Sequence, residues 1–366
     1  MAKLSRRGLM GGMGAAFAVA TAACATTNGA STSIERLSLN ENAYGPSPRV
    51  LQAIENNLDR LERYVDADEV ARLTNAIAAL EHVAPEQIVL GEILEPLGLQ
   101  LAASRAGGGE FIYSAPGYTA LIDAAAALGG TGRPVPLNAN LENDLPALSA
   151  AIGPRTLAVS LVNPHNPSGT VDDAAAFDRF VETSTQRTLV VVDEAYLEYT
   201  EQEFETRSAI RFARSGANVL VFRTLAKVYG LAGVSLGYGV APITLAERLR
   251  AAGLGSPHGL NRLSLVAAEA ALSDQAHVRS VVARTRANRD RVHAALNSLG
   301  LRNTASRANF VFFESRLPAD DVRRALTTRN VTPGRAFPPL DRWIRITIGT
   351  GADTDRTIAA LRAIYS

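Results

Sequence analysis

The sequence is poor in lysine. Of its 37 lysine and arginine residues, only Lys3 and Lys227 are lysines. Arginine stays protonated at any working pH, whereas a buried lysine can lose its proton and become a nucleophile. Lys3 lies in the amino-terminal segment that is described below as an expected signal peptide. Because the chain uses arginine for nearly all of its other positive charge, Lys227 indicates a position where an amine is required. The alternative interpretation is that Lys227 is a surface lysine without a role.

The sequence also has few cysteines and histidines, and its net charge is close to zero. The one cysteine, Cys24, has no partner for an internal disulfide. The five histidines show no spacing typical of metal ligands, so we expect no metal site. The net charge of the 366 residues is +1, and nothing in this balance points to nucleic acid as a partner.

The apolar run near the amino terminus, residues 9–20, is too short to span a membrane comfortably. It follows Ser5-Arg6-Arg7-Gly8-Leu9-Met10, which resembles the twin-arginine export motif. Ala23-Cys24-Ala25 fits an A-x-A cleavage site. We therefore expect residues 1–25 to be a twin-arginine signal peptide, and the protein to be exported to the periplasm by the twin-arginine machinery. The alternatives are a lipoprotein acylated at Cys24 and a disordered cytoplasmic tail.

Short apolar runs alternate with helical stretches through most of the chain. We expect residues 26–62 to form an arm that contains a helix at about 49–61. The alternation over residues 63–255 predicts a large α/β domain, in which a mainly parallel central sheet is flanked by helices. Residues 256–366 predict a smaller α+β C-terminal domain. The predicted strands are residues 88–90, 111–114, 156–162, 189–193, 219–222, 237–240, 309–313 and 343–348.

Polar motifs stand where several of these predicted strands end. In open α/β sheets ligands bind at the carboxyl ends of the strands, so we expect the motifs to meet there. They contain the groups that pyridoxal phosphate (PLP) chemistry needs: an amine, a carboxylate for the ring nitrogen, hydrogen-bond donors and an arginine for an anionic substrate. The motifs are Asn166-Pro-Ser-Gly169, Asp193-Glu-Ala-Tyr196, Thr224-Leu-Ala-Lys227 and Arg345-Ile-Thr-Ile-Gly349.

From about residue 37 to the C-terminus, the chain resembles the fold-type I PLP-dependent transferases. Among them it most closely resembles the class I/II aminotransferases of the histidinol-phosphate aminotransferase family. The segment Leu39-Asn-Glu-Asn-Ala-Tyr-Gly-Pro46 and the tripeptide Leu231-Ala-Gly233 strengthen this closer match. The resemblance implies transfer of an amino group from an amino acid or related amine to a 2-oxo acid, with PLP as the cofactor.

The resemblance also implies roles for the residues that would hold the cofactor ring. Lys227 would form the Schiff base and shuttle the proton between substrate and cofactor, and Asp193 would pair with the pyridine nitrogen. Tyr196 and Asn166 would bind the phenolic oxygen, and Tyr118 would stack on the ring. Without the resemblance, Asp193 would be interpreted as a helix cap, Tyr196 as a core residue and Asn166 as a turn residue.

Four further residues are implied to bind the cofactor phosphate or the substrate. Thr224 would contact the phosphate, and Tyr64 would reach the phosphate of a partner subunit, which implies a homodimer. Arg345 would grip the carboxylate or phosphate of the substrate. Tyr44 would line the substrate pocket.

The predicted phosphate site departs from the family pattern. Ser235 stands where the family usually has an arginine, and Ala226 where a serine often precedes the lysine. Glu92 and Glu95 add negative charge to a turn that donates backbone N–H groups in the family, and Pro96 removes one N–H.

This departure leaves three functions open. The first is an aminotransferase. The second is other PLP chemistry, carried out by a lyase, a decarboxylase or a racemase. The third is a non-catalytic binding protein on the same fold. Arg223 is one candidate for replacing the missing arginine.

Overall fold

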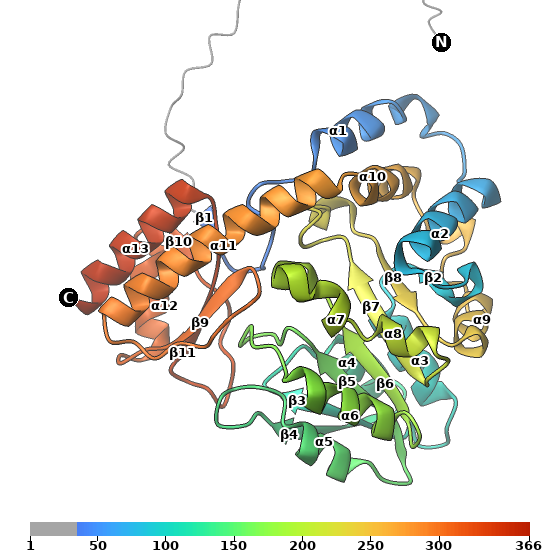
Figure 1. Ribbon diagram of the computed structural model, residues 1–366, viewed down its shortest axis with the longest axis horizontal. Coiled ribbons are helices and arrows are strands. Elements are labelled where there is room, and N and C mark those ends of the chain that lie inside the picture. Colours follow the sequence, from blue (N-terminus) through green and yellow to red (C-terminus); the bar gives the residue numbers. More distant parts are fainter. Residues whose placement is uncertain (1–34) are drawn as a thin grey trace, which may run out of the picture. The chain divides into compact units, whose positions relative to one another are not determined.

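The computed structural model describes residues 35–366, apart from a few side chains, and the predicted signal peptide lies outside these residues. A seven-stranded sheet forms the centre of the described chain. Its strands are β2 (Ile88–Leu90), β3 (Glu110–Ala115), β4 (Thr131–Pro136), β5 (Thr156–Val162), β6 (Leu189–Asp193), β7 (Val219–Thr224) and β8 (Gly237–Val240). They lie in the order β2-β8-β7-β6-β5-β3-β4, and β8 is antiparallel to both of its neighbours (Figure 1). The run from β7 to β4 is parallel, which confirms the predicted mainly parallel sheet.

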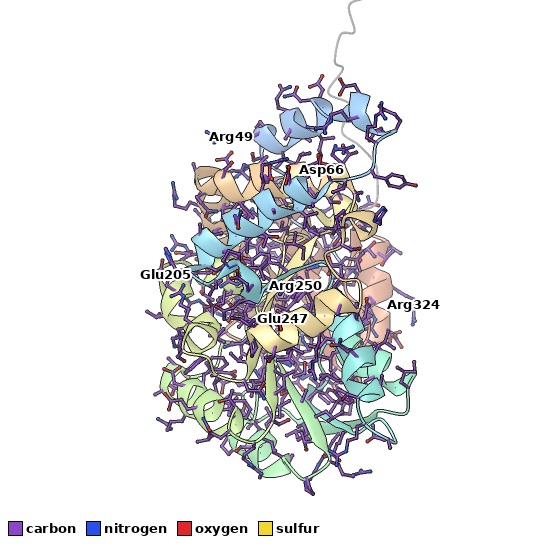
Figure 2. The ribbon with its side chains drawn as sticks, turned by 90° about the vertical axis from the view of Figure 1, so that its right-hand side faces the viewer. Arg49, Asp66, Glu205, Glu247, Arg250 and Arg324 are labelled. Atoms are coloured by element: carbon purple, nitrogen blue, oxygen red, sulfur yellow. The ribbon has the colours of Figure 1, made fainter. Side chains whose placement is uncertain are left out.

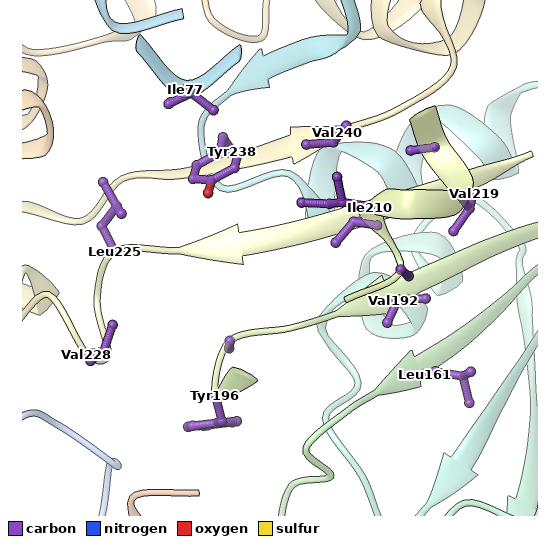
Figure 3. Packing of buried hydrophobic residues seen from close by; sticks show 14 of the residues in the cluster. Ile77, Leu161, Val192, Tyr196, Ile210, Val219, Leu225, Val228, Tyr238 and Val240 are labelled. Atoms are coloured by element: carbon purple, nitrogen blue, oxygen red, sulfur yellow. The ribbon is translucent and has the colours of Figure 1, made fainter. Parts of the chain in front are cut away.

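The apolar strand β6 is buried on both faces, and successive side chains enter different cores. Val190 and Val192 belong to one cluster, whereas Leu189 and Val191 belong to the other. Helices α3 (Leu94–Ala103), α4 (Ala120–Ala126) and α9 (Ile243–Ala251) cover the second face. The first face is covered by α2 (Ala67–Glu81), α5 (Leu145–Ala151), α6 (Ala174–Ser184), α8 (Ile210–Arg214) and α10 (Arg262–Ser273). Figure 3 shows part of the first cluster, with Val192 of β6, Val219 of β7 and Ile210 of α8.

A second, smaller sheet positions one predicted site residue. Strand β9 (Phe310–Glu314) pairs antiparallel with β11 (Trp343–Thr347), and Arg345 stands opposite Phe312. Helices α12 (Ala319–Thr327) and α13 (Gly351–Tyr365) pack with this sheet around a separate core. Helix α11 (Gln275–Ser298) runs from the helices beside the central sheet to α12 and α13 (Figure 1), and its two halves contribute to different cores.

Several elements differ from the sequence-based expectation. Strand β4 was not predicted, because its glycine and two prolines disfavour the interior of a sheet. It is an edge strand that pairs only with β3. Short strands β1 (Glu35–Arg36) and β10 (Val331–Thr332) were also not predicted, and they pair in parallel.

The expected helix at about 49–61 is shorter in the structure. Helix α1 (Pro48–Glu55) ends at residue 55 and is followed by the turn η1 (Leu58–Arg60). Asp66, which Figure 2 labels at the start of the next helix, then caps α2 in a capping box with Glu69. The other short elements are η2 (Pro85–Gln87), η3 (Leu197–Glu203), α7 (Phe204–Arg207), η4 (Ala232–Val234) and η5 (Pro257–Gly259). No helix within residues 35–366 is both long and apolar enough to cross a membrane.

Helices α3 and α4 are packed too closely for a side chain at Gly98. A Cβ at this position would lie 2.2 Å from the carbonyl oxygen of Leu121 in α4. We therefore expect Gly98→Ala to lower the free energy of unfolding by about 1–3 kcal/mol, because backbone must move to admit the methyl group. Urea unfolding measures this loss. Gly153→Ala is the control, since nothing lies within 4 Å of a Cβ there, and an equal loss in both variants would contradict the close-packing argument.

Candidate active site

The predicted motifs meet at one edge of the central sheet. Because β5, β6 and β7 are parallel neighbours, their carboxyl ends lie side by side. A cavity of about 700 Å³ lies at this edge and is closed in part by the amino-terminal segment 38–41. Seven of the nine predicted site residues line it: Tyr118, Asn166, Asp193, Tyr196, Thr224, Lys227 and Arg345.

Lys227 projects its amine into this cavity. Its Nζ donates a hydrogen bond to the backbone carbonyl oxygen of Leu39, at 3.2 Å. The carbonyl belongs to the amino-terminal segment, 188 residues earlier in the chain. The segment therefore orients the amine of Lys227, the one lysine within residues 35–366.

Asp193 is the last residue of β6, and its carboxyl group is buried. Burial raises the pKa of Asp193 to about 7, although the hydrogen bond from the Ala195 N–H and the positive charge of Lys227 oppose this shift. No ion pair within residues 35–366 includes Asp193. A carboxyl group in this state would be stabilised as a carboxylate by a ligand that brings a cationic N–H.

The hydroxyl of Tyr196 is held by two side-chain amides at the cavity wall. The side-chain amides of Asn40 and Asn166 both donate to its oxygen, at 3.0 and 3.5 Å. Arg345 Nη1 donates to Asn166 Oδ1 at 2.5 Å, which fixes the orientation of that amide. A hydroxyl has two acceptor lone pairs and one hydrogen, so Tyr196 remains able to donate to a ligand oxygen.

Arg345 is a buried cation without a carboxylate partner in the described chain. Its side chain is only 7% exposed, and burial lowers its pKa from the ordinary value. Besides the bond to Asn166, Nη2 donates to the carbonyl oxygen of Ser38 at 2.7 Å, while Nε has no partner. The guanidinium carbon lies 5.5 and 5.1 Å from the ring centroids of Phe310 and Phe337. A buried, unpaired guanidinium is costly, so this group is suited to an anionic ligand.

Tyr118 and Thr224 complete the predicted wall. Burial, together with the negative charges of Asp193, Glu95 and Glu92, raises the pKa of Tyr118 to about 12. Its hydroxyl group therefore stays protonated and the side chain uncharged. The Thr224 oxygen accepts a hydrogen bond from the N–H of residue 226 at 3.1 Å. Its own hydrogen is left to donate to a ligand.

The structure does not bring Tyr44 and Tyr64 to the cavity wall. The Tyr44 oxygen accepts a hydrogen bond from Asn288, and Arg284 stacks over its ring at 3.7 Å. Tyr64 is 81% exposed, and its ring lies 5.3 Å from that of His258. The role of Tyr64 at a partner's cofactor stays a prediction, as does that of Tyr44.

The side chains at the altered phosphate site contact each other. Ser235 donates a hydrogen bond to Glu92 at 2.5 Å, and both residues line the cavity together with Ala226. The candidate replacement, Arg223, is used elsewhere. It is buried in a cluster with three acidic side chains, and none of the cluster lines this cavity. The partners are Glu194 at 3.0 Å, Glu81 at 3.7 Å and Glu198 at 3.8 Å.

Sequence reasoning missed three contributors to the site. Asn40 lies within the segment that carried the closer resemblance, but no role was predicted for it. Leu39 acts through its backbone carbonyl, which its side-chain type does not reveal. Arg335 lines the cavity, and nothing in the sequence distinguishes it from the many other arginines. No group of three His, Cys, Asp or Glu residues within 35–366 is arranged to hold a metal ion.

The residues present fit PLP. Asp193 has a buried carboxyl group that forms no ion pair within residues 35–366. A protonated pyridine nitrogen would supply the missing partner. The Tyr196 hydrogen is free for the phenolic oxygen, and Lys227 places an amine in the same cavity. The fold and this site define a PLP-dependent enzyme of fold type I.

Comparison with known proteins identifies the family. The family described as "Aminotransferase class I and II" matches residues 32–362, and the chain belongs to this family. It is therefore a PLP-dependent transaminase. Family membership favours transamination over the lyase, decarboxylase, racemase and non-catalytic alternatives.

The most similar relatives include the histidinol-phosphate aminotransferase of Moorella thermoacetica, which is 36% identical over 90% of this chain and 85% of the relative. Histidinol-phosphate aminotransferase 2 of Carboxydothermus hydrogenoformans is 34% identical over 91% of each chain. Among solved structures, the histidinol-phosphate aminotransferase of Sinorhizobium meliloti in complex with PLP has a TM-score of 0.79 and 29% identity. That match covers 90% of this chain and 91% of the other. This chain is thus histidinol-phosphate aminotransferase-like.

Asp193 should make the stability of the cofactor-free protein depend on pH. Since the folded-state pKa, about 7, lies above the ordinary 3.8, stability from this group is complete below pH 4 and is lost as pH rises through 7. Asp193→Asn removes this loss. We expect the variant to gain up to about 4 kcal/mol relative to the parent between pH 4 and pH 8.

Denaturant unfolding of parent and variant at the two pH values measures this gain. Asp172→Asn is the control, because burial also raises the pKa of Asp172 to about 7, while Asp172 does not line the cavity. Both variants should show the pH effect, but only Asp193→Asn should lose cofactor affinity. A constant difference between parent and Asp193→Asn across pH would show that Asp193 is ionised throughout.

Proposed function

We propose that the protein exchanges an amino group between an amine substrate bound through Arg345 and a 2-oxo acid, with Lys227 as the covalent anchor and proton carrier. One observation supports this most strongly. The buried Arg345, which has no carboxylate partner within residues 35–366, opens onto the same cavity as Lys227 and Asp193. An anionic group at Arg345 would hold a substrate in reach of the amine.

Each side chain then has a chemical task. When bound, PLP supplies an electron sink for the substrate's α-carbon. Asp193 would keep the ring nitrogen protonated, and Tyr196 would donate its hydroxyl hydrogen to the phenolic oxygen. Lys227 Nζ accepts the proton from the substrate's α-carbon, as a positioned general base. The carbonyl of Leu39 orients this amine, and the segment 38–41 forms part of the cavity wall.

The substrate that we propose is an amino acid or related amine with a carboxylate. Arg345 is suited equally to a carboxylate or a phosphate, because its guanidinium can bind either with two parallel hydrogen bonds. The relatives from Moorella thermoacetica and Carboxydothermus hydrogenoformans are named as aminotransferases of histidinol phosphate. Export would separate this chain from the cytoplasmic pathway that makes that compound, and this separation favours a different amino donor.

A homodimer is part of the proposal. Leu51, Leu58 and Leu61 are 58%, 51% and 60% exposed, and Tyr64, on the same segment, is 81% exposed. Exposed apolar side chains gathered in this way are typical of protein interfaces. A partner subunit packed on this segment would bury them and would allow Tyr64 to approach the partner's cofactor.

Lys227→Ala should abolish turnover, with a loss of at least 10²–10⁴-fold, because the proton carrier is removed. Borohydride reduction of the parent should leave the cofactor attached to the peptide that contains Lys227, as mass spectrometry detects. Lys227→Arg is the control for charge, since arginine keeps the cation but cannot form the covalent link. Full activity in either variant, or label on another peptide, would exclude this assignment.

Export by the twin-arginine route can be tested separately. Replacement of Arg6 and Arg7 by lysine keeps the positive charge, but we expect it to stop transport, so that the protein stays in the cytoplasm. Cell fractionation with immunoblotting measures the distribution. Unchanged export would contradict the twin-arginine route, and acylation of Cys24 would identify a lipoprotein instead.

A further inference from the structure

The order of the strands fixes the order of the side chains along the cavity edge. Asn166 follows β5, Asp193 ends β6, and Thr224 ends β7. Ser235 precedes β8, whose first residue pairs with Thr224, and Glu92 follows β2, the strand beyond β8. Asn166 and Glu92 therefore lie on opposite sides of Asp193.

The shape of PLP relates this order to its phosphate. On the pyridine ring the carbon that binds the amine stands opposite the nitrogen, and the phenolic oxygen and the phosphate arm flank that carbon on its two sides. With the nitrogen at Asp193 and the phenolic oxygen at Asn166, the phosphate arm would point toward Thr224, Ser235 and Glu92. This step rests on the proposed function.

Glu92 is a fixed acceptor on that side. Ser235 donates to its carboxylate, and no ion pair within residues 35–366 includes Glu92. The cations that line the cavity, Lys227, Arg335 and Arg345, form no ion pair with it. The other charged or titratable groups around the cavity are Tyr118, Tyr196, Asp193, Glu95 and Glu41, of which Glu41 is paired with Arg36.

A phosphate dianion in contact with an unpaired carboxylate is unfavourable, because like charges at contact distance disfavour each other's ionised form. The second pKa of a phosphate monoester is about 6, so one proton is readily regained. The monoanion carries a P–O–H group, which can donate a charge-assisted hydrogen bond to a carboxylate.

We propose that Glu92, oriented by Ser235, accepts a hydrogen bond from the cofactor's phosphate, so that this site selects the hydrogen-bearing monoanion. At pH 7 or above, where the free phosphate is a dianion, one proton from solvent is taken up on binding. The hydrogen stays on the phosphate oxygen, and Thr224 donates to another phosphate oxygen. An arginine at 235 would favour the dianion instead.

Isothermal titration calorimetry of the full chain stripped of cofactor tests this inference. Pyridoxamine phosphate is the probe, because it has no aldehyde and its binding does not report the covalent step at Lys227. Titrations at pH 8 in two buffers with different ionisation enthalpies count the protons taken up. Affinities at pH 6.5 and 8.5 give the pH dependence for the parent, Glu92→Gln, Glu95→Gln and Ser235→Arg.

We expect the parent to take up about one more proton at pH 8 than Glu92→Gln, and to lose at least tenfold more affinity between pH 6.5 and 8.5. The charge of Glu92 also contributes to the raised pKa of Asp193, so part of the difference between the two proteins comes from Asp193, and the same titrations with pyridoxamine measure this part. Glu95→Gln, which makes the same change in charge outside the cavity wall, should behave as the parent, whereas Ser235→Arg should lose the extra proton. Pyridoxamine, which has no phosphate, should show only the part of the Glu92 dependence that comes from Asp193.

Equal proton uptake in the parent and Glu92→Gln would overturn the inference while leaving the aminotransferase function in place. If Glu92→Gln and Glu95→Gln both lost the extra proton uptake, the inference would also be overturned. Negative charge near the cavity, without a hydrogen bond to Glu92, would then explain the uptake. A requirement for Mg²⁺ or Ca²⁺ in place of the proton would assign the contact to a bridging cation and overturn it too. If neither PLP nor pyridoxamine phosphate binds, the cofactor assignment itself fails, and the borohydride test shows this independently.

Discussion

Asp193 lies at the carboxyl end of β6, where helices cover both faces of the sheet and no cation within the described chain pairs with its carboxyl group. This burial raises its pKa to about 7 although the Ala195 N–H and the charge of Lys227 oppose the shift, so a cationic ligand would further stabilise its charged form. The parallel neighbours β5 and β7 place the amide of Asn166 and the amine of Lys227 beside it. The geometry of the site follows from this one position.

Three parts of the chain must come together before the cavity is complete. Arg345, on the small sheet, donates to Asn166 on a loop of the central sheet and to the carbonyl of Ser38 in the amino-terminal segment. The same segment supplies Asn40, which donates to Tyr196. These bonds link the substrate-binding cation to the groups that hold the ring, so a displacement of the small sheet would disturb both.

The two sides of the site are built on different strands, which allows them to differ from the family pattern independently. The ring side depends on β3, β5, β6 and the end of β7, and the residues predicted for it all line the cavity. The phosphate side depends on the turn after β2 and the residues before β8, where Ser235 and Glu92 replace the expected contacts. A change at Ser235 therefore need not alter the burial of Asp193.

The sequence by itself predicted the mainly parallel sheet and most of its strands, because alternating apolar runs are local patterns, and its resemblance to the family predicted seven residues of the cavity wall. It did not reveal β4, whose prolines disfavour strands and whose stability comes from pairing with β3. Only the tertiary structure decided the contacts of Asn40, whose bonds reach Tyr196 and Thr347 across 156 and 307 residues. It also decided that Arg223 is paired with buried carboxylates away from the cavity. Such contacts depend on which distant segments meet on folding, and no local pattern of residue types specifies that meeting.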